Sequence, residues 1–316
     1  MRFGTLDDVR YGAVDVVGPG IRRVIAENPS RFTYHGTGTY VVGGGGAGVA
    51  VIDPGPNLDS HRDALAAALA GEQVVAICVT HCHRDHSPLA AWLRAETGAP
   101  TVAFGPPGVA EDPDDPAEPG AEIAEGIKLE DSVEVDFVPD VTVADGAVAA
   151  SGGTGAERWT LRAVHTPGHT SNHHCYAFEE AGVLFTGDHI MGWSTTVISP
   201  PDGDMGAYFE SLRKVAGRHD GRLWPTHGPA IDQPDEYVEA LLAHRLNRER
   251  QVLDALGAGP ATIPAIVAKL YDDVDEALHK AAARSVLAHI RKLVGEGVVV
   301  TADGAPPRAA STYARI

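Results

Sequence analysis

The amino-acid sequence predicts a mixed α/β domain followed by a small domain of the winged-helix type. Over residues 1–236, apolar strand-like runs alternate with helical segments, and this alternation is typical of an α/β domain. After residue 236 the pattern changes to three helices and a strand, which is the order of a winged helix-turn-helix. A chain of 316 residues, 44% of them hydrophobic, is long enough for one large and one small domain. We therefore expect domains over 1–236 and 237–305 and a flexible tail over 306–316.

The first elements of the large domain are predicted to be a β-hairpin and a helix. The runs TYVVG (39–43) and GVAVIDPG (48–55) flank the glycine-rich stretch GGGGAG, a pattern typical of two paired strands. A phosphate-binding loop is disfavoured because no lysine followed by serine or threonine comes after these glycines. The segment SHRDALAAALAG then predicts a helix over 60–71, with Ser60 as its N-terminal cap and Gly71 as its stop signal.

A continuous apolar strand is predicted over 73–80, and it leads directly into the segment HCHRDH. The lack of alternation in QVVAICVT is typical of a strand that is buried on both faces. Ser87 and Pro88 are then expected to begin a second helix over 88–98. Further strand-like runs follow over 141–150, 158–166, 173–180, 182–188 and 221–228.

The predicted winged-helix domain consists of three helices and one strand. We expect the helices over 237–257, over 262–271 with Thr262 as cap, and over 275–297, and the strand over 298–303. Four cations lie on the third helix: Lys280, Arg284, Arg291 and Lys292. They indicate either contact with nucleic acid or, as the favoured interpretation, a helix that packs on the large domain or forms a dimer.

The net charge of −18 is unevenly distributed along the chain. From Tyr237 to the end the sequence has ten Lys/Arg and nine Asp/Glu, so residues 1–236 carry a net charge of −19. The stretch 111–140 alone holds twelve acidic residues and one lysine, which predicts a solvated loop. A field of this sign repels phosphates, so broad non-specific binding to nucleic acid or to anionic membranes is disfavoured.

Three features of the sequence predict a soluble, cytoplasmic protein that has no membrane partner. No run of eighteen apolar residues is present. The N-terminal stretch MRFGTLDDVRYGAVDVV has two aspartates where a signal peptide would have its apolar core. The cysteines Cys78, Cys82 and Cys175 are odd in number and scattered, as fits a reducing compartment.

The segment VTHCHRDHSP predicts a metal site. His81 and His83 are two positions apart on an extended segment, so their side chains point to one side while that of Cys82 points away. Asp85 and His86 complete a set of four ligand-type groups. One tetrahedral ion needs fewer groups than this from a single loop, so the segment favours two ions. A patch of solvated charge and a nucleophilic Cys82 are the disfavoured alternatives.

Ligands that complete a two-ion site are predicted farther along the chain. His169 follows the Pro-Gly turn of HTPGHT, Asp188 ends the strand-like run LFTGD, and His227 lies in WPTHGP. Each lies where a strand-type run meets a glycine-containing turn, and functional residues of α/β proteins concentrate at such places. The joint occurrence of all four pieces therefore favours a metal site over unrelated loop residues.

These four pieces resemble the motifs of the metallo-β-lactamase-fold superfamily, which are His-x-His-x-Asp-His, Gly-His, Gly-Asp and a final His. The resemblance covers residues 10–235 and implies an αββα sandwich with the metals at one edge. It also implies two Zn²⁺ ions, with iron or manganese as alternatives. The implied ligands form two sets and a bridge: His81, His83 and His169; Asp85, His86 and His227; and Asp188 between them.

Within the superfamily, the sequence looks like the lactamase-beta-like (endoribonuclease-like) branch that carries a C-terminal winged-helix domain. The stretches GWSTTVISPPDGDMGAYFESL and HIRKLVGEGVV carry this finer likeness. It implies a hydrolase whose nucleophile is a metal-bridging hydroxide, since a metal-bound water can have its pKa lowered to about 7. Asp85 is the predicted catalytic residue, as orienter of that nucleophile. His173, Thr195 and Thr196 are the candidates for substrate binding.

The sequence leaves the substrate open between two classes. Members of the branch include endoribonucleases of single-stranded RNA and thioesterases, so the substrate is either such an RNA or a small-molecule ester or thioester. The winged helix favours RNA, whereas the acidic first domain disfavours it. A mononuclear iron persulfide dioxygenase would use similar ligands, and a metal-sensing winged-helix regulator would need no catalysis. A homodimer is also left open.

Overall fold

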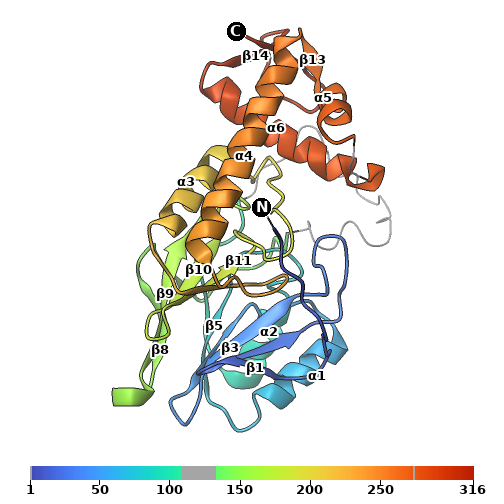
Figure 1. The fold of residues 1–316 in the computed structure, drawn as a ribbon. Helices are drawn as coiled ribbons and strands as arrows, with labels where there is room; N and C mark the ends of the chain where they lie inside the picture. The colour runs from blue at the N-terminus through green and yellow to red at the C-terminus, as the bar shows by residue number, and fades with distance from the viewer. Residues whose placement is uncertain (1, 109–132, 273–274) are drawn as a thin grey trace.

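The computed structural model describes residues 2–108, 133–272 and 275–316 of the chain (Figure 1). Within these ranges two β-sheets pack face to face, and helices cover the outer face of each. The predicted αββα sandwich followed by a winged-helix domain is therefore confirmed. The acidic stretch 111–140, for which we predicted a solvated loop, lies mostly outside the described residues.

The first sheet has seven strands in chain order from β1 to β7. Its pairings are antiparallel from β1 to β4 and parallel from β4 to β7. The predicted hairpin is the β3–β4 pair, and the apolar run 73–80 contains β5. The strands are β1 Asp15–Gly18, β2 Ile21–Ile25, β3 Gly38–Gly43, β4 Val49–Ile52, β5 Val74–Cys78, β6 Thr101–Ala103 and β7 Val141–Thr142.

The second sheet has five strands in the order β12-β11-β10-β9-β8. Only the β11–β12 pair is parallel. Apolar side chains from both sheets, including Tyr40, Trp159 and Phe185, fill the space between them. The strands are β8 Val148–Gly152, β9 Trp159–His165, β10 His174–Phe178, β11 Val183–Gly187 and β12 Arg222–Pro225.

Two helices pack on each sheet. Helices α1 (Asp59–Ala68) and α2 (Leu89–Thr97) cover the first sheet, where Leu93 of α2 contacts the buried face of β3 to β5. Helices α3 (Met205–Ala216) and α4 (Pro234–Gly257) cover the second sheet. None of the helices in the described ranges is both long enough and apolar enough to cross a bilayer.

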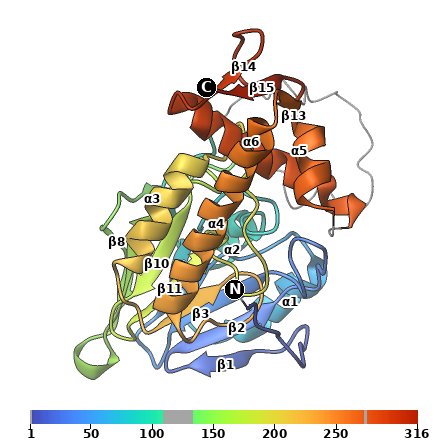
Figure 2. The same cartoon turned by 45° about the horizontal axis from the view of Figure 1, so that its top comes forward.

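The C-terminal domain continues from α4, which runs from the second sheet into this domain (Figure 2). Its N-terminal half packs on the sheet through Val238 and Leu241, and its C-terminal half contributes Val252 and Leu256 to the core of the small domain. One helix therefore belongs to both cores, and the predicted boundary after residue 236 falls in its first turn. The other elements are β13 Ala261–Thr262, α5 Ile263–Leu270, α6 His279–Gly295, β14 Val299–Thr301 and β15 Thr312–Arg315.

The prediction of a flexible tail over 306–316 is wrong for residues 312–315. These residues form β15, the central strand of a three-stranded sheet in the order β13-β15-β14. Tyr313 is fully buried in the core of the small domain. The sequence did not predict this strand because it has no apolar run of its own. The strand is held by pairing with β13 and β14 and by the buried ring of Tyr313.

The predicted helix caps are wrong at two positions. Helix α1 begins at Asp59 with Leu58 before it, so Ser60 lies inside the first turn. Helix α2 has Pro88 at its N-cap position, and the Ser87 hydroxyl instead donates to the carbonyl of His83 at 3.3 Å. Thr262 does precede α5, although its side chain makes no capping hydrogen bond. Tertiary contacts of the loop thus override the local capping preference.

Helix α6, the predicted third helix of the winged-helix domain, packs on the large domain. Lys292 donates to Glu249 of α4 at 2.9 Å, and its ammonium lies over the ring of Phe209 in α3. The Arg284 guanidinium donates to the carbonyl of Pro200 at 3.1 Å. Two of the four cations thus bind groups of the same chain, which favours the packing interpretation over nucleic-acid contact.

Candidate metal centre

The ligand-rich segment after β5 is fixed at the sheet edge by Asp53. Asp53 follows β4, the parallel neighbour of β5. Its two carboxylate oxygens accept hydrogen bonds from the backbone N–H and the hydroxyl of Thr80, at 2.7 and 2.8 Å. Asp53 has a φ of 50°, in the left-handed region that aspartate tolerates better than most residues. Asp53 therefore fixes the position of Thr80, the residue directly before the segment that carries four predicted ligands.

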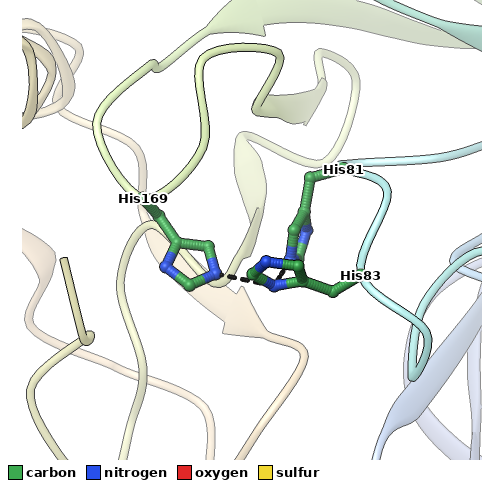
Figure 3. Close-up of side chains that lie close together, drawn as sticks. All are labelled: His81, His83 and His169. Carbon is green, nitrogen blue, oxygen red and sulfur yellow. Dashed lines mark hydrogen bonds between the residues drawn. The ribbon is translucent and has the colours of Figure 1, made fainter. Parts of the chain in front are cut away.

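Three of the predicted ligands form a group of converging imidazoles (Figure 3). His83 Nδ1 lies 2.9 Å from His81 Nε2 and 3.1 Å from His169 Nε2. His169 reaches this point through a tight turn at Gly168, where φ is 137° and an added Cβ would lie 2.4 Å from the Cα of Tyr208. Only glycine fits there. Three nitrogen atoms at this separation can ligate one ion.

A second group is formed by Asp85, His86 and His227. Asp85 Oδ2 lies 3.2 Å from His86 Nε2 and 3.1 Å from His227 Nε2. His227 comes from the far sheet, two residues after β12. The two sheets thus bring together residues that are about 140 positions apart in the chain.

Asp188 lies between the two groups. Its Oδ1 is 3.3 Å from His227 Nε2 and 3.5 Å from His86 Nε2, and its Oδ2 is 3.8 Å from His169 Nε2. Asp188 directly follows β11, which is paired in parallel with β12, so it comes to the same edge as His227. One carboxylate therefore faces both sets of imidazoles.

Four of the five imidazoles are oriented by a hydrogen bond from the ring nitrogen that faces away from the others. This arrangement is typical of metal-ligating histidines, since it fixes both the tautomer and the ring orientation. The four contacts are His81 Nδ1 with the Thr80 hydroxyl (3.0 Å), His86 Nδ1 with the Asp53 carboxylate (2.9 Å), His169 Nδ1 with the Val197 carbonyl (2.8 Å) and His227 Nδ1 with the Gly36 carbonyl (3.2 Å).

The donor set fits divalent metal ions. Within the described residues, His86 Nε2 and Asp188 Oδ1 are buried and make no hydrogen bond, although both lie within ion-pair distance of other ligand atoms. Such atoms are costly to bury unless something binds them. Imidazole nitrogens and carboxylate oxygens suit zinc, iron and manganese, so a cation between these atoms would satisfy them.

The pKa values of His83 and His227 are shifted in opposite directions. Burial lowers the pKa of His83 to about 3, and the neighbouring His169 adds to this effect. For His227, burial lowers the pKa, but Asp188 and Asp85 outweigh burial and raise it to about 10. His83 is therefore a neutral imidazole, the form that binds metal. His227 holds a proton that a cation would displace.

A small cavity of about 30 Å³ opens onto the two groups. Its apolar lining comes from Phe32, Met191 and Val197. No lysine or arginine is among its lining residues in the described part of the chain. The remaining lining residues are Thr33, His83, Asp85, His169, Asp188, Thr196 and His227.

The three candidates for substrate binding lie in different places. His173 is fully buried; its Nδ1 is 2.9 Å from the Thr166 hydroxyl, and its Nε2 accepts from the backbone N–H of Asp188 at 3.1 Å. Both ring nitrogens are thus used to hold the chain, and His173 is not among the residues that line the cavity. Thr196 lines the cavity, but its hydroxyl donates to the carbonyl of Asp188. Thr195 is half-buried beside it.

Cys82 does not face the imidazoles, as strand alternation predicted. Its thiol is buried among apolar residues and accepts a hydrogen bond from the side-chain amide of Asn172 at 2.9 Å. Burial raises the pKa of this thiol to about 12. A nucleophilic role needs the thiolate, so the structure argues against one.

Two residues of the site, Asp53 and Thr37, escaped the sequence analysis. Besides Thr80, the Asp53 carboxylate accepts from Thr226 at 3.2 Å and contacts His86. The Thr37 hydroxyl donates to the Asp85 carboxylate at 3.1 Å. Asp53 had a detectable signal, because it ends an apolar run before Pro-Gly, much as Asp188 ends the run LFTG.

Comparison with known proteins identifies two family matches along the chain. The model described as the metallo-beta-lactamase superfamily matches residues 35–227. The model described as the beta-lactamase associated winged helix domain matches residues 262–305.

Relatives of similar length are found in fungi and animals. An atrochrysone carboxyl ACP thioesterase of Aspergillus chevalieri is 31% identical over 297 residues, which cover 90% of this chain and 83% of that protein. The beta-lactamase-like protein 2 homolog of Drosophila melanogaster is 30% identical over 294 residues, which cover 90% of this chain and 91% of that protein.

A solved structure shares the fold over almost the whole chain. The beta-lactamase domain protein from Burkholderia ambifaria aligns with a TM-score of 0.75 at 22% identity, covering 98% of this chain and 96% of that one.

Proposed function

Since the chain belongs to the metallo-β-lactamase superfamily, we propose that it is a two-metal hydrolase that cleaves thioesters of apolar acyl groups. The superfamily match and the thioesterase relatives support hydrolysis. The metal count, the metal identity and the thioester preference are the proposed parts, and each rests on the residues of the site.

We assign the ligands as the two groups of converging side chains. His81, His83 and His169 would hold one ion, and Asp85, His86 and His227 the other. Asp188, which faces both groups, would bridge them. Zinc is our first choice for this nitrogen and oxygen donor set, and iron and manganese also fit it.

Bound ions would lower the pKa of a coordinated water and polarise the carbonyl of the substrate. The chain contributes the orientation of that water. The Thr37 hydroxyl fixes the Asp85 carboxylate, which could then accept a hydrogen bond from the attacking water and so orient it. No serine or cysteine nucleophile is needed, which agrees with the buried, protonated state of Cys82.

The observation that carries the thioester proposal is the lining of the cavity. The cavity of about 30 Å³ holds only the atoms around a scissile bond, and Phe32, Met191 and Val197 offer apolar contact to the start of an acyl chain. RNA recognition instead relies on cations for the phosphates and on aromatic stacking for the bases. No lysine or arginine lines the cavity among the residues described, and the domain that contains it carries a net charge of −19. The lining therefore favours an uncharged substrate over RNA.

The described lining of the cavity offers no free hydroxyl proton, so it favours a substrate whose leaving group is stable as an anion. Thr33 donates to the carbonyl of Asn28 and Thr196 to that of Asp188, so both protons are already used. Among the described lining residues, every other titratable group is a proposed metal ligand. A thiol has a pKa of about 8.5, so its thiolate can depart without protonation. An alcohol has a pKa near that of water, about 15.7, so its alkoxide needs a proton donor to depart.

The test compares matched thioester and oxygen-ester substrates. We expect zinc-loaded protein to hydrolyse octanoyl-pantetheine with a kcat/KM that exceeds that for its oxygen analogue by about tenfold or more. Single-stranded RNA and a β-lactam serve as further substrates, on which we expect no turnover. The Asp85→Asn variant should lose thioester turnover while its circular dichroism spectrum stays unchanged.

Equal rates on the two octanoyl substrates would refute the leaving-group argument. Faster cleavage of RNA than of the thioester would refute the proposed substrate class and support the endoribonuclease alternative. Turnover that persists in Asp85→Asn would assign the activity to a contaminant or to a different site.

A further inference from the structure

The segment between β11 and α3, residues 188–204, holds two of the proposed ligands in place. The Thr196 hydroxyl donates to the carbonyl of Asp188 at 2.7 Å. The carbonyl of the next residue, Val197, lies 2.8 Å from His169 Nδ1. Two consecutive residues of this segment therefore orient the bridging carboxylate and one imidazole of the first group.

The same segment is held from outside by α4. The Arg245 guanidinium donates to the carbonyl of Thr196 and lies over the ring of Tyr208, whose hydroxyl donates to the carbonyl of His189 at 3.0 Å. A second contact comes from α6, where Arg284 donates to the carbonyl of Pro200. The helices of the C-terminal part thus reach the segment that orients Asp188 and His169.

The burial of Arg245 indicates that its hydrogen bond to the Thr196 carbonyl positions the segment 188–204. Only 4% of Arg245 is exposed, and within the described residues no carboxylate lies within salt-bridge distance of its guanidinium. A buried charge without an opposite charge costs free energy, and an arginine cannot lose its proton. Packing alone therefore does not explain an arginine here, and both of its contacts, with the Thr196 carbonyl and the Tyr208 ring, lead to the segment 188–204.

We propose that Arg245 is a positioning residue for the metal centre. Its donation to the Thr196 carbonyl fixes Thr196 and Val197, and through them Asp188 and His169. The C-terminal helices are in this way a structural part of the metal centre, besides packing on the sandwich. The inference rests on the proposed metal site but is independent of the substrate.

Arg248 provides a matched control on the same helix. Its guanidinium donates to the carbonyl of Leu270 at 2.9 Å and lies 4.1 Å from the ring centre of Tyr271. Arg245 and Arg248 thus make the same two kinds of contact, with a backbone carbonyl and a tyrosine ring. The contacts of Arg248 lie within the C-terminal domain, away from Asp188 and His169.

The experiment measures metal binding in the absence of substrate. Zinc affinity is determined by competition with a chromophoric chelator, and the absorption spectrum of the cobalt-loaded protein reports ligand geometry. For Arg245→Met we expect a loss of zinc affinity of about 10- to 100-fold at one or both positions and an altered cobalt spectrum. Arg248→Met should keep both readouts at wild-type values, and thermal unfolding shows what each variant costs in stability.

A lysine variant separates the positioning role from simple stability. Arg245→Lys keeps the charge and a donor but loses the fork geometry, so its zinc affinity should lie between those of wild type and Arg245→Met. Wild-type zinc affinity and an unchanged cobalt spectrum in whichever Arg245 variants fold would overturn the inference. A wild-type protein that binds no metal would instead refute the proposed function.

Discussion

At the residue scale, Asp53 connects the ligand segment after β5 with the loop that carries His227. Its carboxylate accepts hydrogen bonds from Thr80 on the ligand segment and from Thr226 beside His227, and it contacts His86. A buried carboxylate with several donors is strongly held, because each charge-assisted hydrogen bond is worth about 1.5–3 kcal/mol. Asp53 thus ties both sheets to the second group of ligands.

Replacement of Asp53 by asparagine should weaken metal binding at the second group. Asp53→Asn has one acceptor oxygen in place of two, so its NH₂ must face either His86 Nδ1 or the backbone N–H of Thr80. In either orientation, one contact that positions the ligand segment or His86 is lost. We expect a loss of about 10- to 100-fold in zinc affinity at one of the two positions. Titration with zinc against a competing chelator measures this change.

Asp140→Asn is the control for this variant. The Asp140 carboxylate also accepts from the backbone N–H and the hydroxyl of one threonine, Thr101, at 2.9 and 3.0 Å, but it does so far from the ligands. The control should lose stability without a change in zinc affinity. A comparable loss of zinc affinity in both variants would show that Asp53 acts through general stability and not through His86.

The histidines differ in how far the sequence could define their roles. The spacing of His81 and His83 and the positions of His169 and His227 after strand-like runs were enough to predict that they converge. His173 lies in an equally histidine-rich stretch, yet it supports the backbone of Asp188 from inside the core. Only the path of the chain distinguishes these roles, because the residue type is the same.

At the element scale, the strands and helices followed from apolar patterning, whereas the caps and the last strand did not. The continuous apolar run in β5 and the helical spacing in α4 reflect large, repeated contacts with a core. The hydroxyl of Ser87, by contrast, was expected to cap α2, but it donates to the carbonyl of His83 in the preceding loop. β15 had no apolar run of its own, because it is a short strand that gains its pairing partners only in the fold.

The strand β15 should be necessary for the stability of the C-terminal domain. Tyr313 is fully buried, so Tyr313→Ala removes a large side chain from the core of this domain. We expect a loss of about 3–5 kcal/mol in the free energy of unfolding, as for other aromatic-to-alanine changes in cores. Denaturant unfolding measures it. Ile316→Ala, at a residue with 76% exposure, should change nothing; equal stability of the two variants would restore the idea of a loose tail.

At the scale of the whole molecule, the charge of the chain and its metal centre oppose each other. The large domain carries −19, yet two divalent ions would leave the ligand cluster positive despite the buried carboxylates Asp85 and Asp188. Such a centre attracts a polarised carbonyl oxygen over short distances, while the outer surface repels polyanions at long range. Under the proposed function, this charge distribution would favour small, weakly charged substrates before any specific contact forms.

Metal removal should therefore weaken both the activity and the fold of the whole protein. Elemental analysis is expected to find about two transition-metal ions per chain, since the seven side chains form two groups with a shared carboxylate. An ion that binds only the native state stabilises it by about 4 kcal/mol when its concentration is 1,000 times its dissociation constant. Chelation should thus abolish hydrolysis and lower the melting temperature, and zinc should restore both. A single iron per chain would contradict the two-ion site and favour the mononuclear oxygenase alternative.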